Sequence, residues 1–264
     1  MKSKIDIIWY NSVDSTNEIA RREIMSLDNL SVLSAMSQTS GHGQRGNSWL
    51  SEEGKNLLFS IVLKYASPSI GSSPLPGPVQ AYDQFVISKI ASLSVVDLLA
   101  TYDIQAKIKW PNDIYVEDKK ICGILIEHAV QGKWLKSSII GIGLNINQQN
   151  FDVSLPNPTS MILSSPDRET DFDIKALLVE FMEIFVEYID RFCNITGGYN
   201  RLEKLYLSQL WLKDISAEFM DMTTTPASRF RGTIRGISPF GHLLVEMDNS
   251  EMREFSFKEI AYIN

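Results

Sequence analysis

Residues 105–147 read QAKIKWPNDIYVEDKKICGILIEHAVQGKWLKSSIIGIGLNIN. Short runs of apolar and β-branched residues in this segment predict four successive strands, near 105–109, 113–117, 120–129 and 134–147. The middle of the chain is therefore predicted to be mainly β-structure, and the flanking segments must pack around it.

The flanking segments mix helices with further strands. Ser15-Thr16-Asn17-Glu18 opens a predicted helix that runs to about residue 26, and Ser15 and Glu18 have the spacing of a capping box. Residues 67–78 are rich in Ser, Pro and Gly, which predicts a surface loop. The other predicted elements are strands over 4–10, 31–37 and 56–65 and helices over 81–102, 171–192 and 198–213. From about residue 215, short strand-like runs alternate with turns, which is typical of a small β-barrel-like module.

Composition narrows the class of protein. The 264 residues, 44% of them hydrophobic, suit one large domain or a medium domain with a small one. Acidic residues outnumber basic ones, 32 against 25, which argues against a nucleic-acid partner because such binding needs clustered positive charge. No run approaches the ~20 apolar residues of a membrane span, and charges interrupt the first residues, so neither a membrane partner nor a secretory signal is expected. Cys122 and Cys193 lack a metal-ligand spacing and are expected to be reduced thiols of a cytoplasmic protein.

A glycine-rich loop at residues 40–48 carries Gly41, Gly43 and Gly46. These glycines match the dinucleotide pattern G-x-G-x-x-G, but that pattern opens a helix, whereas this chain continues into a strand. A P-loop is disfavoured for the same reason, and because Asn47 stands where a lysine is needed. On the loop alone, two interpretations stay open: an ordinary turn, and a cradle whose backbone amides approach an anion closely.

Four motifs in order resemble the catalytic domain of biotin–protein ligases. They are Asp14-Ser15-Thr16-Asn17, the loop from Gln38 to Trp49, the pair Lys109-Trp110-Pro111-Asn112-Asp113 and Asp118-Lys119-Lys120-Ile121-Cys122-Gly123-Ile124-Leu125-Ile126-Glu127, and Gly141-Ile142-Gly143-Leu144-Asn145-Ile146-Asn147. The resemblance is close over about residues 8–150 and looser beyond them. Only about a dozen residues precede the first motif, so the class without an N-terminal DNA-binding domain is expected.

The resemblance implies a fold and a reaction. The fold would be α+β, with a mixed, mainly antiparallel sheet and helices on one face over residues 1–214, and an SH3-like β-barrel over 215–264. The reaction would use ATP and Mg²⁺ to convert biotin to biotinyl-5′-AMP, and then transfer biotin to a lysine of a biotin carboxyl carrier protein, a domain of a biotin-dependent carboxylase. The enzyme would be cytoplasmic and a monomer or homodimer.

The resemblance also implies roles for individual residues. Lys120, Asp113 and Arg45 would be catalytic, with Asp113 also a ligand of Mg²⁺, while Lys119 would be a solvated charge. Biotin would be bound by Ser15, Thr16, Asn17, Gln38, Gly41, His42, Gly43, Trp49, Lys120, Gly123 and Gly141, and ATP by Arg45, Gly46, Trp49, Lys109, Asn112, Asp113, Lys120 and Asn145. Several have purely structural alternatives: a helix cap for Ser15, core packing for Trp49, close strand packing for Gly123 and a turn for Asn112-Asp113.

The glycine-rich loop departs from the family pattern. His42, Gln44 and Asn47 replace three arginines, and only Arg45 remains. Fewer fixed cations predict weaker retention of the adenylate than in arginine-rich relatives. Lipoate or octanoate ligation, and a weakly active or non-catalytic biotin-binding relative, stay open as alternatives.

Overall fold

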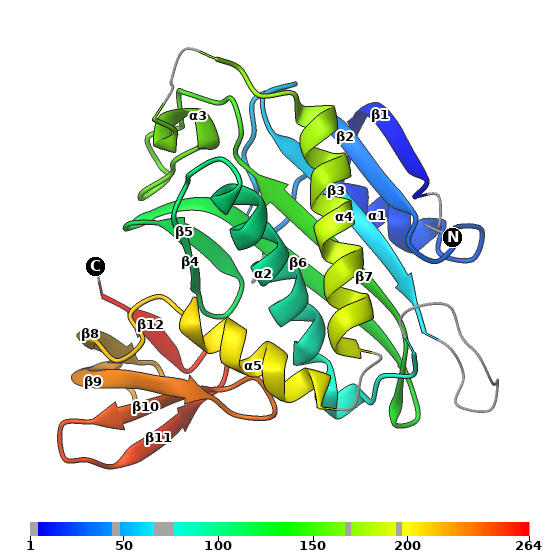
Figure 1. The fold of residues 1–264 in the computed structure, drawn as a ribbon. Helices are drawn as coiled ribbons and strands as arrows, with labels where there is room; N and C mark the ends of the chain where they lie inside the picture. The colour runs from blue at the N-terminus through cyan, green and yellow to red at the C-terminus, as the bar shows by residue number, and fades with distance from the viewer. Residues whose placement is uncertain (1–4, 44–47, 66–76, 167–169, 194–196, 264) are drawn as a thin grey trace.

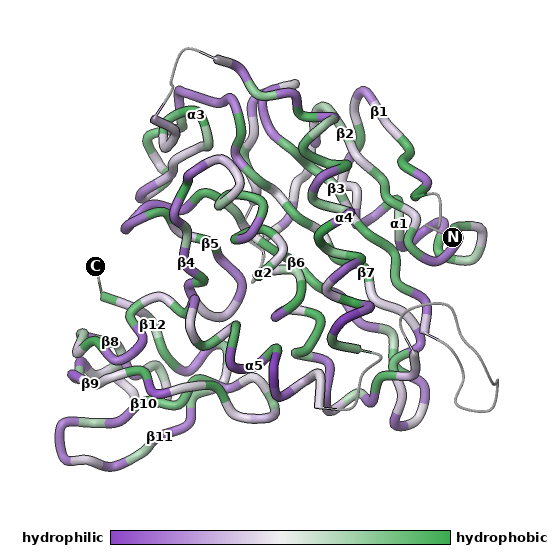
Figure 2. The backbone as a smooth tube through the Cα atoms, in the orientation of Figure 1, coloured by the Kyte–Doolittle hydropathy of each residue, from purple (hydrophilic) through white to green (hydrophobic). Residues whose placement is uncertain are grey.

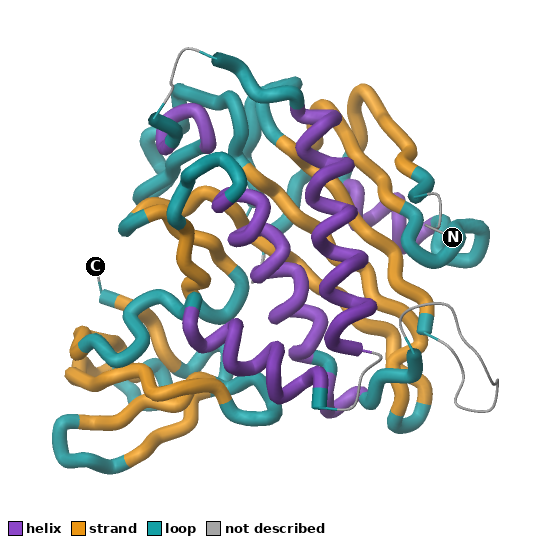
Figure 3. The backbone as a smooth tube through the Cα atoms, in the orientation of Figure 1, coloured by secondary structure: helices purple, strands orange, loops and turns teal. Residues whose placement is uncertain are grey.

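The computed structural model describes residues 5–43, 48–65, 77–166, 170–193 and 197–263. It contains two β-sheets and a group of helices (Figures 1 and 3). Arg45, Gly46 and most of the predicted surface loop at 67–78 lie outside the described residues. Within the described part, no helix is both long and apolar enough to cross a membrane.

The larger sheet has seven strands in the order β1-β2-β3-β7-β6-β5-β4. Only β1 and β2 pair in parallel, because α1 connects them, whereas the other pairs are antiparallel. The predicted mixed, mainly antiparallel sheet is therefore confirmed. Its strands are β1 (Ile7–Val13), β2 (Val32–Gln38), β3 (Leu57–Lys64), β4 (Ala106–Lys109), β5 (Asp113–Val116), β6 (Lys119–Gln131) and β7 (Trp134–Leu144).

Helices α2 (Phe85–Ala100) and α4 (Ile174–Cys193) cover one face of this sheet, with α5 (Gly198–Ser208) beside them (Figures 1 and 3). Both β3 and α2 consist almost entirely of buried residues, and both are largely hydrophobic in Figure 2. The short helix α1 (Thr16–Arg22) packs with a second, smaller cluster that contains Ile19, Leu33 and Val62. The larger hydrophobic cluster lies between the sheet and helices α2 and α4, and alternate residues of β2 and β3 point into the larger and the smaller cluster. Helix α1 therefore lies on the face of the sheet opposite to α2 and α4.

The predicted boundaries shift at several places. Strand β1 begins at Ile7 and ends at Val13, and α5 ends at Ser208, five residues before the predicted end. A 3-10 turn, Ala81–Asp83, precedes α2, and the short helix α3 (Met161–Ser164) was not predicted.

The predicted capping box at α1 is wrong. Ser15 is the N-cap residue but its side chain makes no capping hydrogen bond, and Glu18 instead pairs with Arg21. The amide of Thr16 donates to Oε1 of Gln38 at 2.8 Å, so a side chain from the sheet caps the helix. A tertiary contact replaces the local one that the sequence predicted.

The C-terminal sheet has five antiparallel strands in the order β11-β10-β9-β8-β12. Their bounds are β8 (Ser216–Asp221), β9 (Ser228–Ile237), β10 (Leu243–Met247), β11 (Met252–Phe255) and β12 (Ile260–Tyr262). This sheet joins the rest of the molecule through buried contacts: Nε1 of Trp110 donates to the carbonyl of Gly241 at 2.8 Å. The small β-structure predicted after residue 215 is confirmed.

Candidate active site

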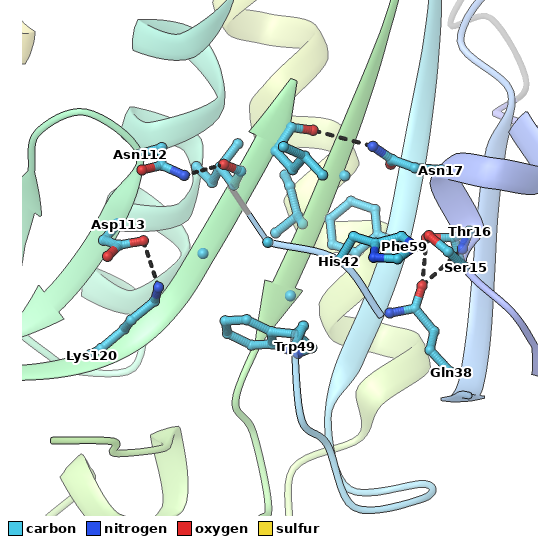
Figure 4. A pocket seen from close by; sticks show the side chains of 17 residues that line it. Ser15, Thr16, Asn17, Gln38, His42, Trp49, Phe59, Asn112, Asp113 and Lys120 are labelled. Carbon is cyan, nitrogen blue, oxygen red and sulfur yellow. Dashed lines mark hydrogen bonds and ion pairs between the residues drawn. The ribbon is translucent and has the colours of Figure 1, made fainter. Parts of the chain in front are cut away.

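A pocket lies on the face of the large sheet that carries α1, over strands β3, β6 and β7 (Figure 4). Its cavity volume is about 60 Å³. Most of the residues that the sequence predicted for ligand binding line it. The lining residues are Ser15, Thr16, Asn17, Gln38, His42, Gly43, Trp49, Phe59, Asn112, Asp113, Lys120, Gly123, Ile124, Leu125, Gly141, Ile142 and Gly143.

Three glycines form the floor of the pocket. Gly123 of β6 pairs directly with Gly143 of β7, and Gly141 lies two residues before Gly143 on the same face. A Cβ added at Gly143 would lie 2.5 Å from Cε2 of Trp49, and one at Gly123 would lie 2.9 Å from Cζ3 of the same ring. The glycines therefore allow the Trp49 indole to rest on the backbone of the two strands, which agrees with the close-packing interpretation of Gly123.

Trp49 itself fills part of the pocket. Its amide donates to the carbonyl of Gly41 at 2.9 Å, which places Gly41 behind the tryptophan instead of on the pocket wall. Its buried Nε1 has no hydrogen-bond partner among the described residues. A Cβ added at Gly143 would lie 2.7 Å from this nitrogen, so the indole N–H faces the backbone of β7.

One end of the pocket is polar and uncharged. Oε1 of Gln38 accepts from the amide of Thr16 at 2.8 Å and lies 3.2 Å from its hydroxyl. Asn17, only 5% exposed, lies over Gly141, where an added Cβ would be 2.9 Å from Cγ of Asn17. Ser15, Thr16 and Asn17 come from the start of α1 and Gln38 from the end of β2, so parallel pairing of β1 and β2 brings them together (Figure 4).

The other end carries a cation and a carboxylate. Nζ of Lys120 lies 2.7 Å from Oδ1 of Asp113, with both side chains partly exposed (Figure 4). The backbone of Lys120 is fixed by neighbours from another loop, because its amide donates to Asn157 at 2.7 Å and its carbonyl accepts from Thr159 at 2.9 Å. Lys119 is exposed, as predicted for a solvated charge. Nδ2 of Asn112 donates to the carbonyl of Ile124 at 2.7 Å and ties this end to β6.

Two predicted ATP ligands lie beside the pocket and do not line it. Nζ of Lys109 donates to the hydroxyl of Tyr115 at 3.0 Å and lies between the rings of Tyr115, Trp211 and Tyr262, at 4.4, 4.9 and 4.8 Å from their centroids. Burial lowers the pKa of Lys109. Asn145 is buried, and its Nδ2 donates to the carbonyl of Thr159 at 2.9 Å.

Sequence reasoning missed part of the pocket wall. Phe59 and Ile142 line it, yet both read as ordinary buried strand residues. Ser60 and Glu127 contact Asn17 from outside the lining and were not singled out. Glu127 is the last residue of the motif that begins at Asp118, but no local pattern indicates that its side chain reaches α1.

The residues fit a magnesium ion only in part. Within the described ranges, no group of three or more His, Cys, Asp or Glu side chains is arranged to hold a metal. Mg²⁺ in nucleotide enzymes commonly uses one or two carboxylates together with substrate phosphates. Asp113 fits that arrangement, as one carboxylate beside Lys120.

The pocket combines three chemical environments. Neutral donors and acceptors occupy one end, apolar side chains and an indole the middle, and a lysine with a carboxylate the other end. This arrangement suits a ligand with an uncharged polar head, an apolar chain and a terminal anion.

Known proteins are similar to this chain in sequence and in fold. A protein of Bacillus spizizenii named "Bifunctional ligase/repressor BirA" is 34% identical over 150 residues, which cover 55% of this chain and 42% of the relative. A Bacillus subtilis protein of the same name is 28% identical over 258 residues, 95% of this chain and 72% of the relative. The solved "Biotin protein ligase from Aquifex aeolicus in complex with biotin and ATP" has a TM-score of 0.74 at 24% identity, over 98% of this chain and 99% of that one. This last likeness shows the fold.

The sequence profile of the Biotin/lipoate A/B protein ligase family matches residues 9–145, slightly more than half of the chain. This segment holds α1, most of β1, all of β2 to β7 and every residue that lines the pocket. The chain therefore belongs to the biotin/lipoate A/B protein ligase family.

Proposed function

We propose that this protein is a biotin–protein ligase. It activates biotin with ATP to biotinyl-5′-AMP and transfers biotin to a lysine of a carrier protein, the biotin carboxyl carrier domain of a biotin-dependent carboxylase. The observation that carries the proposal is one pocket with an uncharged polar end and with Lys120 at the other end. Biotin has a neutral ureido ring at one end and a carboxylate at the other.

The residues have separate roles in this reaction. Ser15, Thr16 and Gln38 bind the ureido group, and the glycine floor and Trp49 surround the ring and chain. Lys120 draws the biotin carboxylate and the α-phosphate of ATP together and stabilises the charge that develops between them. We assign the remaining sites to the nucleotide, including Lys109, Asn112, Asn145 and the undescribed Arg45 and Gly46.

Mg²⁺ would arrive with the ATP phosphates and neutralise part of their charge. Asp113 would hold it, and this role competes with its ion pair to Lys120. The same competition would free the Lys120 ammonium for the biotin carboxylate.

The second candidate substrates are lipoate and octanoate, because the family includes enzymes for lipoate. Their distal ends carry no N–H or carbonyl groups. Binding them would leave the Nε2 donor of Gln38 and a lone pair of the Thr16 hydroxyl without a ligand partner, and such losses cost about 1–3 kcal/mol each. The polar end therefore favours biotin.

A direct experiment tests the proposal. The protein is incubated with ATP, Mg²⁺ and biotin, and exchange of labelled pyrophosphate into ATP is followed with biotin, lipoate or octanoate as the acid. Biotin-dependent exchange and a mass increase of one biotinyl group on an added carrier domain are expected. Exchange with lipoate but not biotin would reassign the substrate, and no exchange with any acid would reject the ligase reaction.

The proposal extends to the rest of the chain. We assign the catalytic domain to residues 1–214 and the C-terminal domain to 215–264, and we expect a cytoplasmic enzyme that is a monomer or a homodimer. Size-exclusion chromatography with light scattering separates the two oligomeric states.

A further inference from the structure

Two side chains outside the pocket contact its polar end. Ser60 of β3 is fully buried, and its Oγ lies 2.6 Å from Oδ1 of Asn17 and 2.7 Å from Oγ1 of Thr16. Glu127 of β6 accepts a hydrogen bond from Nδ2 of Asn17 at 3.0 Å through Oε2. Neither Ser60 nor Glu127 lines the pocket. Together with Asn17 and Thr16 they form one chain of hydrogen bonds, which we call the Glu127 relay.

The carboxylate of Glu127 decides which group donates in each hydrogen bond of the relay. An ionised carboxylate only accepts, so Glu127 requires the amide nitrogen of Asn17 to face it. The carbonyl of Leu125, 3.5 Å from the same nitrogen, favours the same orientation. The amide oxygen of Asn17 therefore faces Ser60, and Ser60 must donate its single proton to it.

The hydroxyl of Thr16 is fixed in turn. Ser60 shares its proton between Oδ1 of Asn17 and the hydroxyl of Thr16, which accepts it at 2.7 Å. Thr16 keeps its own proton and donates it to Oε1 of Gln38 at 3.2 Å. Thr16 therefore presents its remaining lone pair to the pocket, and Gln38, whose Oε1 accepts from both the amide and the hydroxyl of Thr16, presents its Nε2 donor.

We infer that the Glu127 relay sets the hydrogen-bonding polarity of the polar end, with Ser60 and Glu127 as positioning residues for the ligand's head group. This inference rests on the proposed function. The resulting pattern, an acceptor at Thr16 beside a donor at Gln38, matches a cyclic urea, in which N–H groups flank a carbonyl. If the side-chain amide of Asn17 could rotate freely, the polar end of the pocket would lose this discrimination.

Ion pairing on the outer side holds Glu127 in place. Arg21 of α1 pairs with Oε1 of Glu127 and also with both carboxylate oxygens of Glu18, at 2.9 Å. Asn17 and Arg21 are one helical turn apart and so reach Glu127 from the same side of α1. Arg21 is about half exposed, and its ion pair is expected to add little to ligand binding.

The test is a set of four variants in the full-length protein, assayed by biotin-dependent ATP–pyrophosphate exchange. Ser60→Ala and Glu127→Leu are expected to raise the KM for biotin by about tenfold and about threefold to tenfold, because each loses one hydrogen bond to Asn17 and acts on the ligand only through that residue. The KM for ATP and kcat should stay within about twofold of wild type, since Lys120 and Asp113 are untouched. Glu127→Gln keeps an acceptor for Asn17 and should restore a KM close to wild type, and Arg21→Met is the matched control for the outer ion pair.

Each result has one meaning. A biotin KM unchanged in both Ser60→Ala and Glu127→Leu would overturn the relay, as would equal changes in the KM for ATP and in kcat, because a general disturbance of folding has that signature. An effect of Arg21→Met as large as that of Glu127→Leu would also overturn it, because the ion pair would then be the active feature. A wild-type protein with no biotin-dependent exchange would instead reject the proposed function, and the relay with it.

Discussion

The two ends of the pocket are built differently. At the polar end, Thr16, Asn17 and Gln38 are held by hydrogen bonds that come from three strands and one helix, and Thr16 and Asn17 are buried. At the charged end, Lys120 and Asp113 are partly exposed and bound chiefly to each other. The polar end is organised before a ligand arrives, whereas the charged end must exchange its ion pair for contacts with the ligands. Binding specificity and chemistry therefore depend on different parts of one pocket.

The largest effect is expected at the charged end. Lys120→Ala removes the cation that stabilises charge between the carboxylate and the α-phosphate, and such a loss lowers the rate by about 10²- to 10³-fold or more. Biotin-dependent ATP–pyrophosphate exchange measures it. Lys119→Ala, at the exposed neighbouring position, is the matched control and should retain wild-type exchange. Equal losses in the two variants would remove the distinction between the two ends.

At the polar end, Gly141→Ala should raise the KM for biotin by roughly ten- to a hundredfold with a smaller change in kcat. The added Cβ would press on Asn17, which Ser60 and Glu127 hold in place, and overpacking of this kind costs about 1–3 kcal/mol. Steady-state kinetics with varied biotin measures the split. Gly236→Ala is the control, since its nearest neighbours would lie 3.9 Å and 4.0 Å away. A fall in kcat without a change in the biotin KM would contradict the assignment of this end to recognition.

Both ends depend on β6, and the stability of this strand should vary with pH through His128. Burial lowers the pKa of His128 to about 4 from its usual value of about 6.5. The unfolded chain therefore binds more protons between these values, and the free energy of unfolding should fall as the pH falls from about 6.5 towards 4. The expected loss is about 1–3 kcal/mol, less than the full shift because the ring is partly exposed. Urea denaturation at several pH values, with His128→Gln beside the wild type, checks this; the same slope in both proteins would rule out His128 as its source.

The smallest effect is expected from a cation added at His42, which lies on the side of the polar end in Figure 4. His42 lines the pocket and is exposed, and the resemblance to biotin–protein ligases implies an arginine at this position. His42→Arg should slow the release of biotinyl-5′-AMP by roughly twofold to fivefold, as expected for one exposed charge pair, and added salt should reduce the difference. Stopped-flow measurement of adenylate release tests it, with the neutral His42→Gln as control. Release that is equally fast in His42→Arg and His42→Gln would show that the missing arginines do not set retention.

Much of the fold was predictable because its signals are local. The runs in 105–147 formed four paired strands near the predicted positions, and α2 and α4 formed where apolar residues recur at helical spacing. The capping box failed because Glu18 has a better partner in Arg21, and because the amide of Thr16 is satisfied by Gln38, 22 residues away. The end of α5 also shifted, since the carbonyl of Gln209 accepts from the amide of Ile108 in β4 and the amide of Trp211 donates to the carbonyl of Ile108, bonds that no helical pattern contains.

The sequence by itself determined most of the residues that line the pocket. They lie in short motifs whose spacing is specific, among them Ser15, Gln38, Lys120 and the three floor glycines. Only the tertiary structure decided how they work together. Antiparallel pairing of β6 with β7 sets Gly123 against Gly143, the closeness of α1 to β6 joins Asn17 to Glu127, and an aromatic cage takes Lys109 out of the pocket lining. These contacts join residues far apart in the chain, so their geometry depends on strand register and packing and not on local sequence.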